Sequence, residues 1–141
     1  MPKSLDTAKA KLTIVSRTFT PEEVSGRIGL PWDDARRIGD PKGKSGQTWG
    51  ENIWWMYETS EGHEDGRSVD LRLQECLGRL RDRVSSSFQA IRTLSETETV
   101  EVGLYMLAQT VPPIHIAAAT LDFINCLGAD LDVDIVIYEG D

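Results

Sequence analysis

The chain has 141 residues and a formal net charge of −8, and 40% of its residues are apolar and 27% charged. This length favours a single domain that can bury a core without a metal ion or a disulfide bond. The negative charge argues against nucleic acid as a partner, and no apolar run approaches the ~20 residues of a membrane helix. Because the first residues are polar and lack an apolar stretch, we expect no signal peptide, a cytoplasmic location and no membrane association.

The first half of the chain predicts a strand, a helix and a long loop. Residues 1–10 are expected to form a flexible N-terminal arm, and residues 11–141 a single domain. Polar and apolar residues alternate over Lys11–Ser16, which indicates a strand. A helix is then expected from the capping residue Thr20 to Ile28, because Pro21 suits its first position and Gly29 its end.

Residues 31–50 are rich in glycine, proline and charge, so we expect an ordered but irregular loop. Loops of this length in compact domains are often functional. The aromatic and β-branched residues of Asn52–Thr59 predict the next strand.

The second half predicts helix, strand, helix and strand. Apolar residues recur at three- and four-residue steps from Val69 to Leu94, which predicts one amphipathic helix of about 25 residues. Residues 99–109 alternate and indicate a strand. A helix is expected over 114–127, before Gly128, and a last strand over 131–138.

The predicted order is therefore β-α-β-α-β-α-β, which favours an α+β sandwich of two layers. We expect a four-stranded mixed or antiparallel sheet with helices packed on one face. Because the last strand has acidic residues at alternate positions, the opposite face is expected to be free of helices.

The adjacent residues Trp54 and Trp55 lie in a predicted strand, so their side chains point to opposite faces. One tryptophan is expected in the core and the other on the open face. Three partners for this open face stay possible at this stage: the 31–50 loop with Trp32, a second subunit in a homodimer, and a ligand or partner protein.

The last third of the chain is purely acidic, since residues 98–141 contain eight Asp or Glu and no Lys or Arg. Asp130, Asp132 and Asp134 share one face of the last strand. The sequence argues against a calcium loop, because Ile135 occupies the position that requires glycine and Asp141 the position that requires glutamate. Two interpretations remain. The aspartates form a solvated acidic surface, or they pair with one of three arginines: Arg17, Arg36 and Arg37.

Residues with potential catalytic or metal chemistry are scattered. Cys76 and Cys126 lie outside any Cys-x-x-Cys pair, so we expect buried free thiols. His63 lies among acidic residues, but a charged surface turn explains it better than a metal site. No nucleophile–base pair, phosphate loop or dinucleotide motif is present, so we predict no catalytic residue, no cofactor and no metal ion.

Several short motifs together resemble a bacterial family catalogued as domain-of-unknown-function family 4279 (DUF4279). Thr20–Asp40 is similar to the family's helix with its proline and Gly-Asp ending, and a tryptophan-containing strand and a long leucine-rich helix follow in the same order. The closing residues 127–138 resemble the family's last strand with alternating aspartates. The resemblance covers residues 11–138 and implies a compact α+β domain without implying an activity.

Two functions are considered. The first is a non-enzymatic interaction domain, of an inhibitor or immunity type, that binds a basic protein through the open face, the 31–50 loop and the acidic last strand. The alternative is a small-ligand-binding protein or enzyme with a pocket between that loop and the sheet. The predicted binding residues are Trp32, Arg36, Arg37, Trp49, Trp54, Trp55, Asp132, Asp134 and Tyr138.

Overall fold

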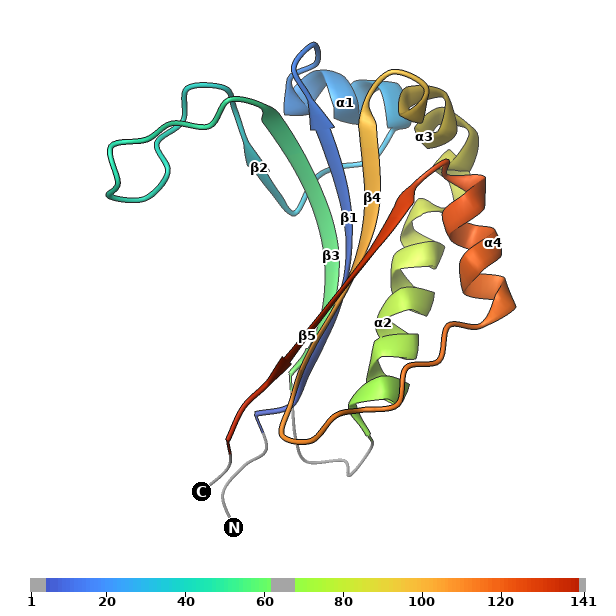
Figure 1. Ribbon diagram of the computed structural model, residues 1–141. Helices are drawn as coiled ribbons and strands as arrows, with labels where there is room; N and C mark the ends of the chain where they lie inside the picture. The colour runs from blue at the N-terminus through green and yellow to red at the C-terminus, as the bar shows by residue number, and fades with distance from the viewer. Residues whose placement is uncertain (1–4, 62–67, 140–141) are drawn as a thin grey trace.

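A computed structural model describes residues 5–61 and 68–139 of the chain. Its centre is an open five-stranded sheet in the order β2-β3-β1-β4-β5 (Figure 1). The strands are β1 (Thr7–Ser16), β2 (Asp34–Arg36), β3 (Asn52–Glu61), β4 (Thr99–Ala108) and β5 (Asp130–Ile137). Neighbouring strands are antiparallel except for β4 and β5, which are parallel. The prediction of a mixed sheet in an α+β fold is therefore confirmed.

The prediction of four strands is wrong, because β2 is a fifth strand within the segment 31–50. This strand has three residues and pairs with residues 53–55, near the N-terminal end of β3. A run this short, flanked by proline, glycine and charged residues, carries no readable alternation. At the N-terminus, β1 begins at Thr7 and not at Lys11, so residues 7–10 belong to the sheet and not to an arm.

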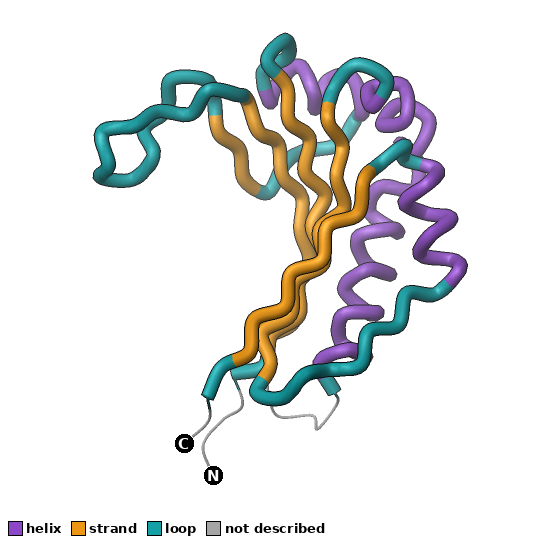
Figure 2. The backbone as a smooth tube through the Cα atoms, viewed as in Figure 1, coloured by secondary structure: helices purple, strands orange, loops and turns teal. Residues whose placement is uncertain are grey.

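The helices lie on one side of the sheet and leave the other side open (Figure 2). They are α1 (Pro21–Ile28), α2 (Val69–Val84), the short 3₁₀ turn η1 (Ser85–Ser87), α3 (Phe88–Ser95) and α4 (Ala118–Cys126). Helix α1 has the predicted ends. The Thr20 side chain accepts a hydrogen bond from the Glu23 backbone N–H, and Gly29 has the left-handed φ of 73° that ends the helix.

The single long helix predicted over 69–94 is interrupted. Helix α2 ends at Val84, and the three serines of η1 form a turn before α3. Serine side chains compete with helical hydrogen bonds, and the Ser87 hydroxyl donates to the Ile28 carbonyl oxygen at 2.6 Å. The apolar spacing continues through this break, which is why periodicity alone did not reveal it.

Helix α4 is shorter than predicted because the chain stays extended until Ala117, whose ψ is 153°. The helix packs on α3 through Phe123 and Phe88, whose ring centroids lie 5.7 Å apart. It is followed by Gly128, with a φ of 65°. A Cβ at this glycine would lie 2.3 Å from the Ser95 hydroxyl oxygen, so the positive φ and the close contact both favour glycine there.

One continuous apolar core lies between the sheet and the helices. The largest fully buried side chains include Trp54, Leu12, Ile14, Met56, Leu80, Ile91, Met106 and Leu127. Both cysteines are free thiols. Cys76 is buried as predicted, whereas Cys126 is exposed because it lies on the outer side of α4. In the part of the chain that is described, no helix is long and apolar enough to cross a membrane.

Candidate functional site

The two adjacent tryptophans separate the core from the candidate site. Trp54 is 1% exposed, and its indole N–H donates to the Ser25 hydroxyl at 2.9 Å. It is therefore part of the core and not of a binding surface, so its place among the predicted binding residues is wrong. Trp55 lies on the opposite side of the sheet and meets Trp49 edge-on, with ring centroids 6.4 Å apart.

The side of the sheet away from the helices is termed the open face. Strand register aligns its side chains in three rows that run from β3 through β1 and β4 to β5. These rows are Trp55–Thr13–Glu101–Asp130, Tyr57–Lys11–Gly103–Asp132 and Thr59–Lys9–Tyr105–Asp134. Trp55 and Tyr57 thus lie at the β3 side of the open face, the lysines in the middle, and the acidic residues at the β5 side with Tyr105 beside them.

The cations of the open face lean toward the aromatic rings. The Lys9 ammonium lies 4.7 Å from the centroid of the Tyr57 ring, and the Lys11 ammonium lies 5.6 Å from that of Trp55. Arg36 approaches the Trp55 ring as well, at 5.5 Å. These cation–π contacts direct the positive charge toward β3, away from the aspartates of β5.

A shallow hollow of about 220 Å³ lies over Gly103, where the absence of a side chain leaves space. It is lined by Lys9, Lys11, Glu101, Gly103, Leu104, Tyr105, Asp132 and Asp134. The two lysines also line a second hollow of about 200 Å³, on the side of Trp55, Tyr57 and Arg36. A Cβ at Gly103 would lie 3.9 Å from the nearest atom, the Lys11 carbonyl oxygen, so the hollow has room for a small side chain.

The three predicted arginine partners of the β5 aspartates pair with other residues. Arg17 pairs with Glu51 at 3.4 Å, Arg36 with Asp34 at 2.6 Å, and Arg37 with Glu22. Within residues 5–61 and 68–139, no ion pair involves Asp130, Asp132 or Asp134, and all three are exposed. The ion-pair interpretation is therefore wrong, and the solvated acidic surface is what remains.

The loop 37–50 does not cover the open face. It extends away from the sheet beside β2 as a hairpin-like excursion (Figure 1). The Lys42 N–H donates to the Gln47 carbonyl at 2.8 Å, and the Trp49 N–H to the Asp40 carbonyl at 2.9 Å. The Lys42 ammonium lies 4.6 Å from the Trp49 ring centroid. Trp49 of this loop reaches the open face through its contact with Trp55.

Three other predicted residues lie apart from this surface. Trp32 is half-buried against the core, and the Arg37 guanidinium lies 5.8 Å from the centroid of its ring. Tyr138 lies at the far end of the sheet, where its hydroxyl donates to the Asp6 carboxylate at 2.7 Å. The structure thus gathers Arg36, Trp49, Trp55, Asp132 and Asp134 on the open face. The metal candidate His63 lies outside the described residues.

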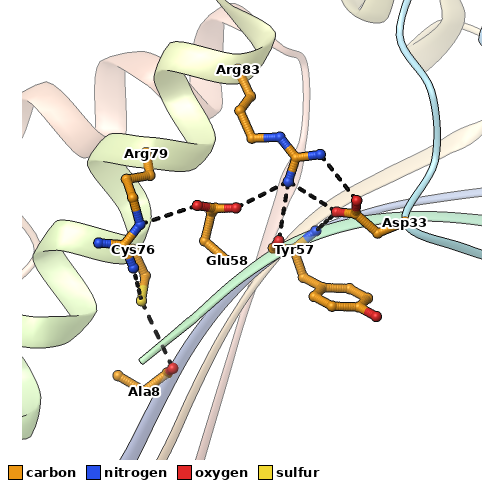
Figure 3. Close-up of polar contacts among 7 residues, drawn as sticks. All are labelled: Ala8, Asp33, Tyr57, Glu58, Cys76, Arg79 and Arg83. Carbon is orange, nitrogen blue, oxygen red and sulfur yellow. Dashed lines mark hydrogen bonds and ion pairs between the residues drawn. The ribbon is translucent and has the colours of Figure 1, made fainter. Parts of the chain in front are cut away.

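A polar network between α2 and the outer edge of β3 was missed in the sequence (Figure 3). The Arg83 guanidinium donates to the two carboxylate oxygens of Asp33 at 2.9 and 3.1 Å, and to Glu58 at 3.0 Å. Arg79 donates to the other oxygen of Glu58 at 3.1 Å. The two arginines are four residues apart on α2, so they lie one helical turn apart and face β3 together.

The network shifts the pKa values of its members. Partial burial alone would raise the pKa of Asp33, but hydrogen bonds from Arg83 and from the Tyr57 N–H outweigh it and hold this pKa below its ordinary 3.8. Hydrogen bonding to Asp33 raises the pKa of Arg83. Burial raises the pKa of the Cys76 thiol, although Arg79 acts in the opposite direction. Cys76 is thus a neutral core thiol and not a reactive nucleophile.

The donor atoms of the described residues do not form a metal site, since no three His, Cys, Asp or Glu side chains among them are placed to hold an ion. The groups available on the open face are ammonium groups, carboxylates and aromatic rings. These groups suit reversible recognition of charged and extended partners.

Comparisons with known proteins identify one family for this chain. A search of the curated proteins and a search of the solved structures each found no match. The sequence matches the family described as Domain of unknown function (DUF4279) over residues 6–138, which is nearly the whole chain. The sheet, the helices that cover it and the open face all lie within this match, and the chain therefore belongs to the DUF4279 family.

Proposed function

We propose that the protein is a non-enzymatic interaction domain that binds a basic protein partner through its open face. One observation supports this most directly. Asp130, Asp132 and Asp134 project from β5 on the open face, exposed and without ion pairs among the described residues. Three aligned carboxylates repel each other, and a cationic partner would relieve that repulsion.

The neighbouring residues would add contact area to this electrostatic attraction. Trp55 and Tyr57 are half-buried on the same face, and Trp49 extends the aromatic surface from the 37–50 loop. Aromatic side chains bury a large area at a low entropic cost, which makes them common anchors in interfaces. An inhibitor or immunity type of role would use such a surface to cover a basic protein.

The test measures binding of a fluorescent octalysine peptide by anisotropy at increasing salt concentration. We expect the triple variant Asp130→Asn, Asp132→Asn, Asp134→Asn to bind about tenfold more weakly, since each cross-strand charge pair is worth about 0.2–1 kcal/mol. Binding by the unaltered chain should weaken with salt.

The matched control removes the same charge from the helical layer, with Asp82→Asn, Glu96→Gln and Asp122→Asn. All three positions are exposed on the other side of the molecule. An equal loss of affinity in both triple variants would mean that net charge alone attracts the peptide, and the proposal of a binding face would be wrong.

The hollow over Gly103 favours a second candidate function, the binding of a small zwitterionic molecule. Lysines line one side of this hollow of about 220 Å³ and carboxylates the other. A ligand with an anionic and a cationic group would match both sides.

We expect one member of a panel of free amino acids to raise the melting temperature of the protein. In the variant Gly103→Val, the added side chain would fill the hollow and abolish that rise, while the strand itself would fold at least as well because valine favours strands. A rise that persists in Gly103→Val, or no rise with any amino acid, would exclude this second function.

A further inference from the structure

Strand β5 is an edge of the sheet whose outer side has free backbone groups. The Tyr138 N–H donates to the Ala108 carbonyl of β4 at 3.0 Å. Backbone N–H groups alternate in direction along a strand, so those of Asp132, Asp134 and Val136 also point toward β4. The N–H and C=O groups of four residues therefore point outward, those of Leu131, Val133, Ile135 and Ile137. In the part of the chain that is described, no strand pairs with this edge.

The helix side of β5 is also incompletely covered. The side chains of Leu131, Val133 and Ile137 are 36%, 38% and 46% exposed. Helix α4 follows β4 in the chain, but its aromatic contact is to α3 and not to β5. Natural sheets usually protect an edge that combines free backbone groups with apolar side chains, because such an edge attracts another strand.

The charges of β5 indicate which strand fits this edge. In an antiparallel pair of two β5 strands, residues of the same face lie opposite one another, so the aspartates of two copies would meet and repel. A strand with lysine or arginine at alternate positions would instead place cations opposite Asp130, Asp132 and Asp134. Its apolar residues would then lie on the helix side, beside Leu131 and Val133.

We propose that β5 binds an extended segment of a partner protein as an additional strand, with Lys or Arg alternating with apolar residues in that segment. This inference rests on the proposed function and adds the mode of binding to it. Main-chain hydrogen bonds to the outer edge provide affinity, and the alternating side chains provide specificity.

The probe is an eight-residue peptide of alternating lysine and valine, the same length as β5. We expect it to bind about tenfold more tightly than the glutamate–valine analogue. Two further peptides have the same sequence but are N-methylated, one at every valine and the other at every lysine. Methylation removes the N–H donors of one side of the added strand and keeps its charge.

Strand addition predicts that one methylated peptide binds and the other does not, because only one set of N–H groups faces β5. Loss with methylated valines indicates antiparallel addition, and loss with methylated lysines indicates parallel addition. Strand addition is wrong if the two methylated peptides have equal affinities. It is also wrong if none of the alternating peptides binds while octalysine does. In both cases the proposed function stands. If octalysine also fails to bind, both are wrong.

Amide hydrogen exchange measured by NMR provides an independent readout. The parent peptide should slow exchange at Leu131, Val133 and Ile135, whose N–H groups point outward, and leave Asp132 and Asp134 unchanged. If the outward amides are already protected in the free protein, in a manner that depends on its concentration, a second copy occupies the edge and the proposal is overturned.

Discussion

Replacement of Trp54 by alanine should lower the free energy of unfolding by about 3–5 kcal/mol, the range for the removal of a large aromatic side chain from a core. Trp54 is 1% exposed and packs between β3 and the helices. The variant also leaves the Ser25 hydroxyl without its indole partner. Chemical denaturation followed by circular dichroism measures this loss.

The neighbouring residue is the matched control for this prediction. Trp55→Ala removes the same side chain from the open face, where it is only partly buried, so we expect a loss of about 1 kcal/mol. Equal losses in the two variants would contradict the assignment of the two tryptophans to core and surface. Trp55→Ala should in addition weaken octalysine binding, whereas Trp54→Phe should leave it intact.

Replacement of Arg83 by methionine should destabilise the protein by about 1–3 kcal/mol near neutral pH, the range for loss of hydrogen bonds to charged groups. The methionine keeps the aliphatic part of the side chain but removes the guanidinium that binds Asp33 and one of the two that bind Glu58. The matched variant Asp33→Asn removes the charge on the other side of the pair. In a double-mutant cycle, we expect the combined loss to be smaller than the sum of the single losses.

The same pair predicts a dependence of stability on pH. Because the pKa of Asp33 is held below 3.8 in the folded state, the carboxylate contributes stability at every pH above that value. This contribution is lost as the pH falls from about 3.8 through the folded pKa of Asp33. The difference in unfolding free energy between the unaltered chain and Asp33→Asn should therefore be smaller at pH 3 than at pH 7. An equal difference at both pH values would contradict the ion pair.

The sequence predicted the elements whose signals are local. The Thr20–Gly29 helix, the alternating strands and the acidic face of β5 depend on caps and on periods of 2 or 3.6, which are readable without tertiary contacts. The break at Ser85–Ser87 was not predicted, because the apolar period continues through it. Strand β2 was missed since three residues carry no period, and their extended form depends on pairing with β3.

The candidate site was predicted only in part, because its local pattern could be read from the sequence but its tertiary contacts could not. Alternation required that Trp54 and Trp55 face opposite sides, but the side that each would take depends on strand register, which a single sequence does not give. The predicted ion pairs between the β5 aspartates and Arg36 or Arg37 were wrong, because in the folded chain these arginines pair with Asp34 and Glu22. Arg83 and Asp33 are 50 residues apart, so nothing local linked them.

The polar network around Arg83 also limits the addition of strands from other molecules at the β3 edge of the sheet. At the β3 edge, the Tyr57 N–H donates to Asp33 and the Tyr57 carbonyl accepts from Arg83, so side chains of the same chain already use these edge groups. The N-terminal part of that edge, residues 53–55, is paired with the three residues of β2, which lead into the loop with Pro41. A head-to-tail fibre needs a long free edge on both sides of each molecule, and among the described residues the edge strand on this side is only the three-residue β2. Strand addition at β5 would therefore stop at one partner segment per chain.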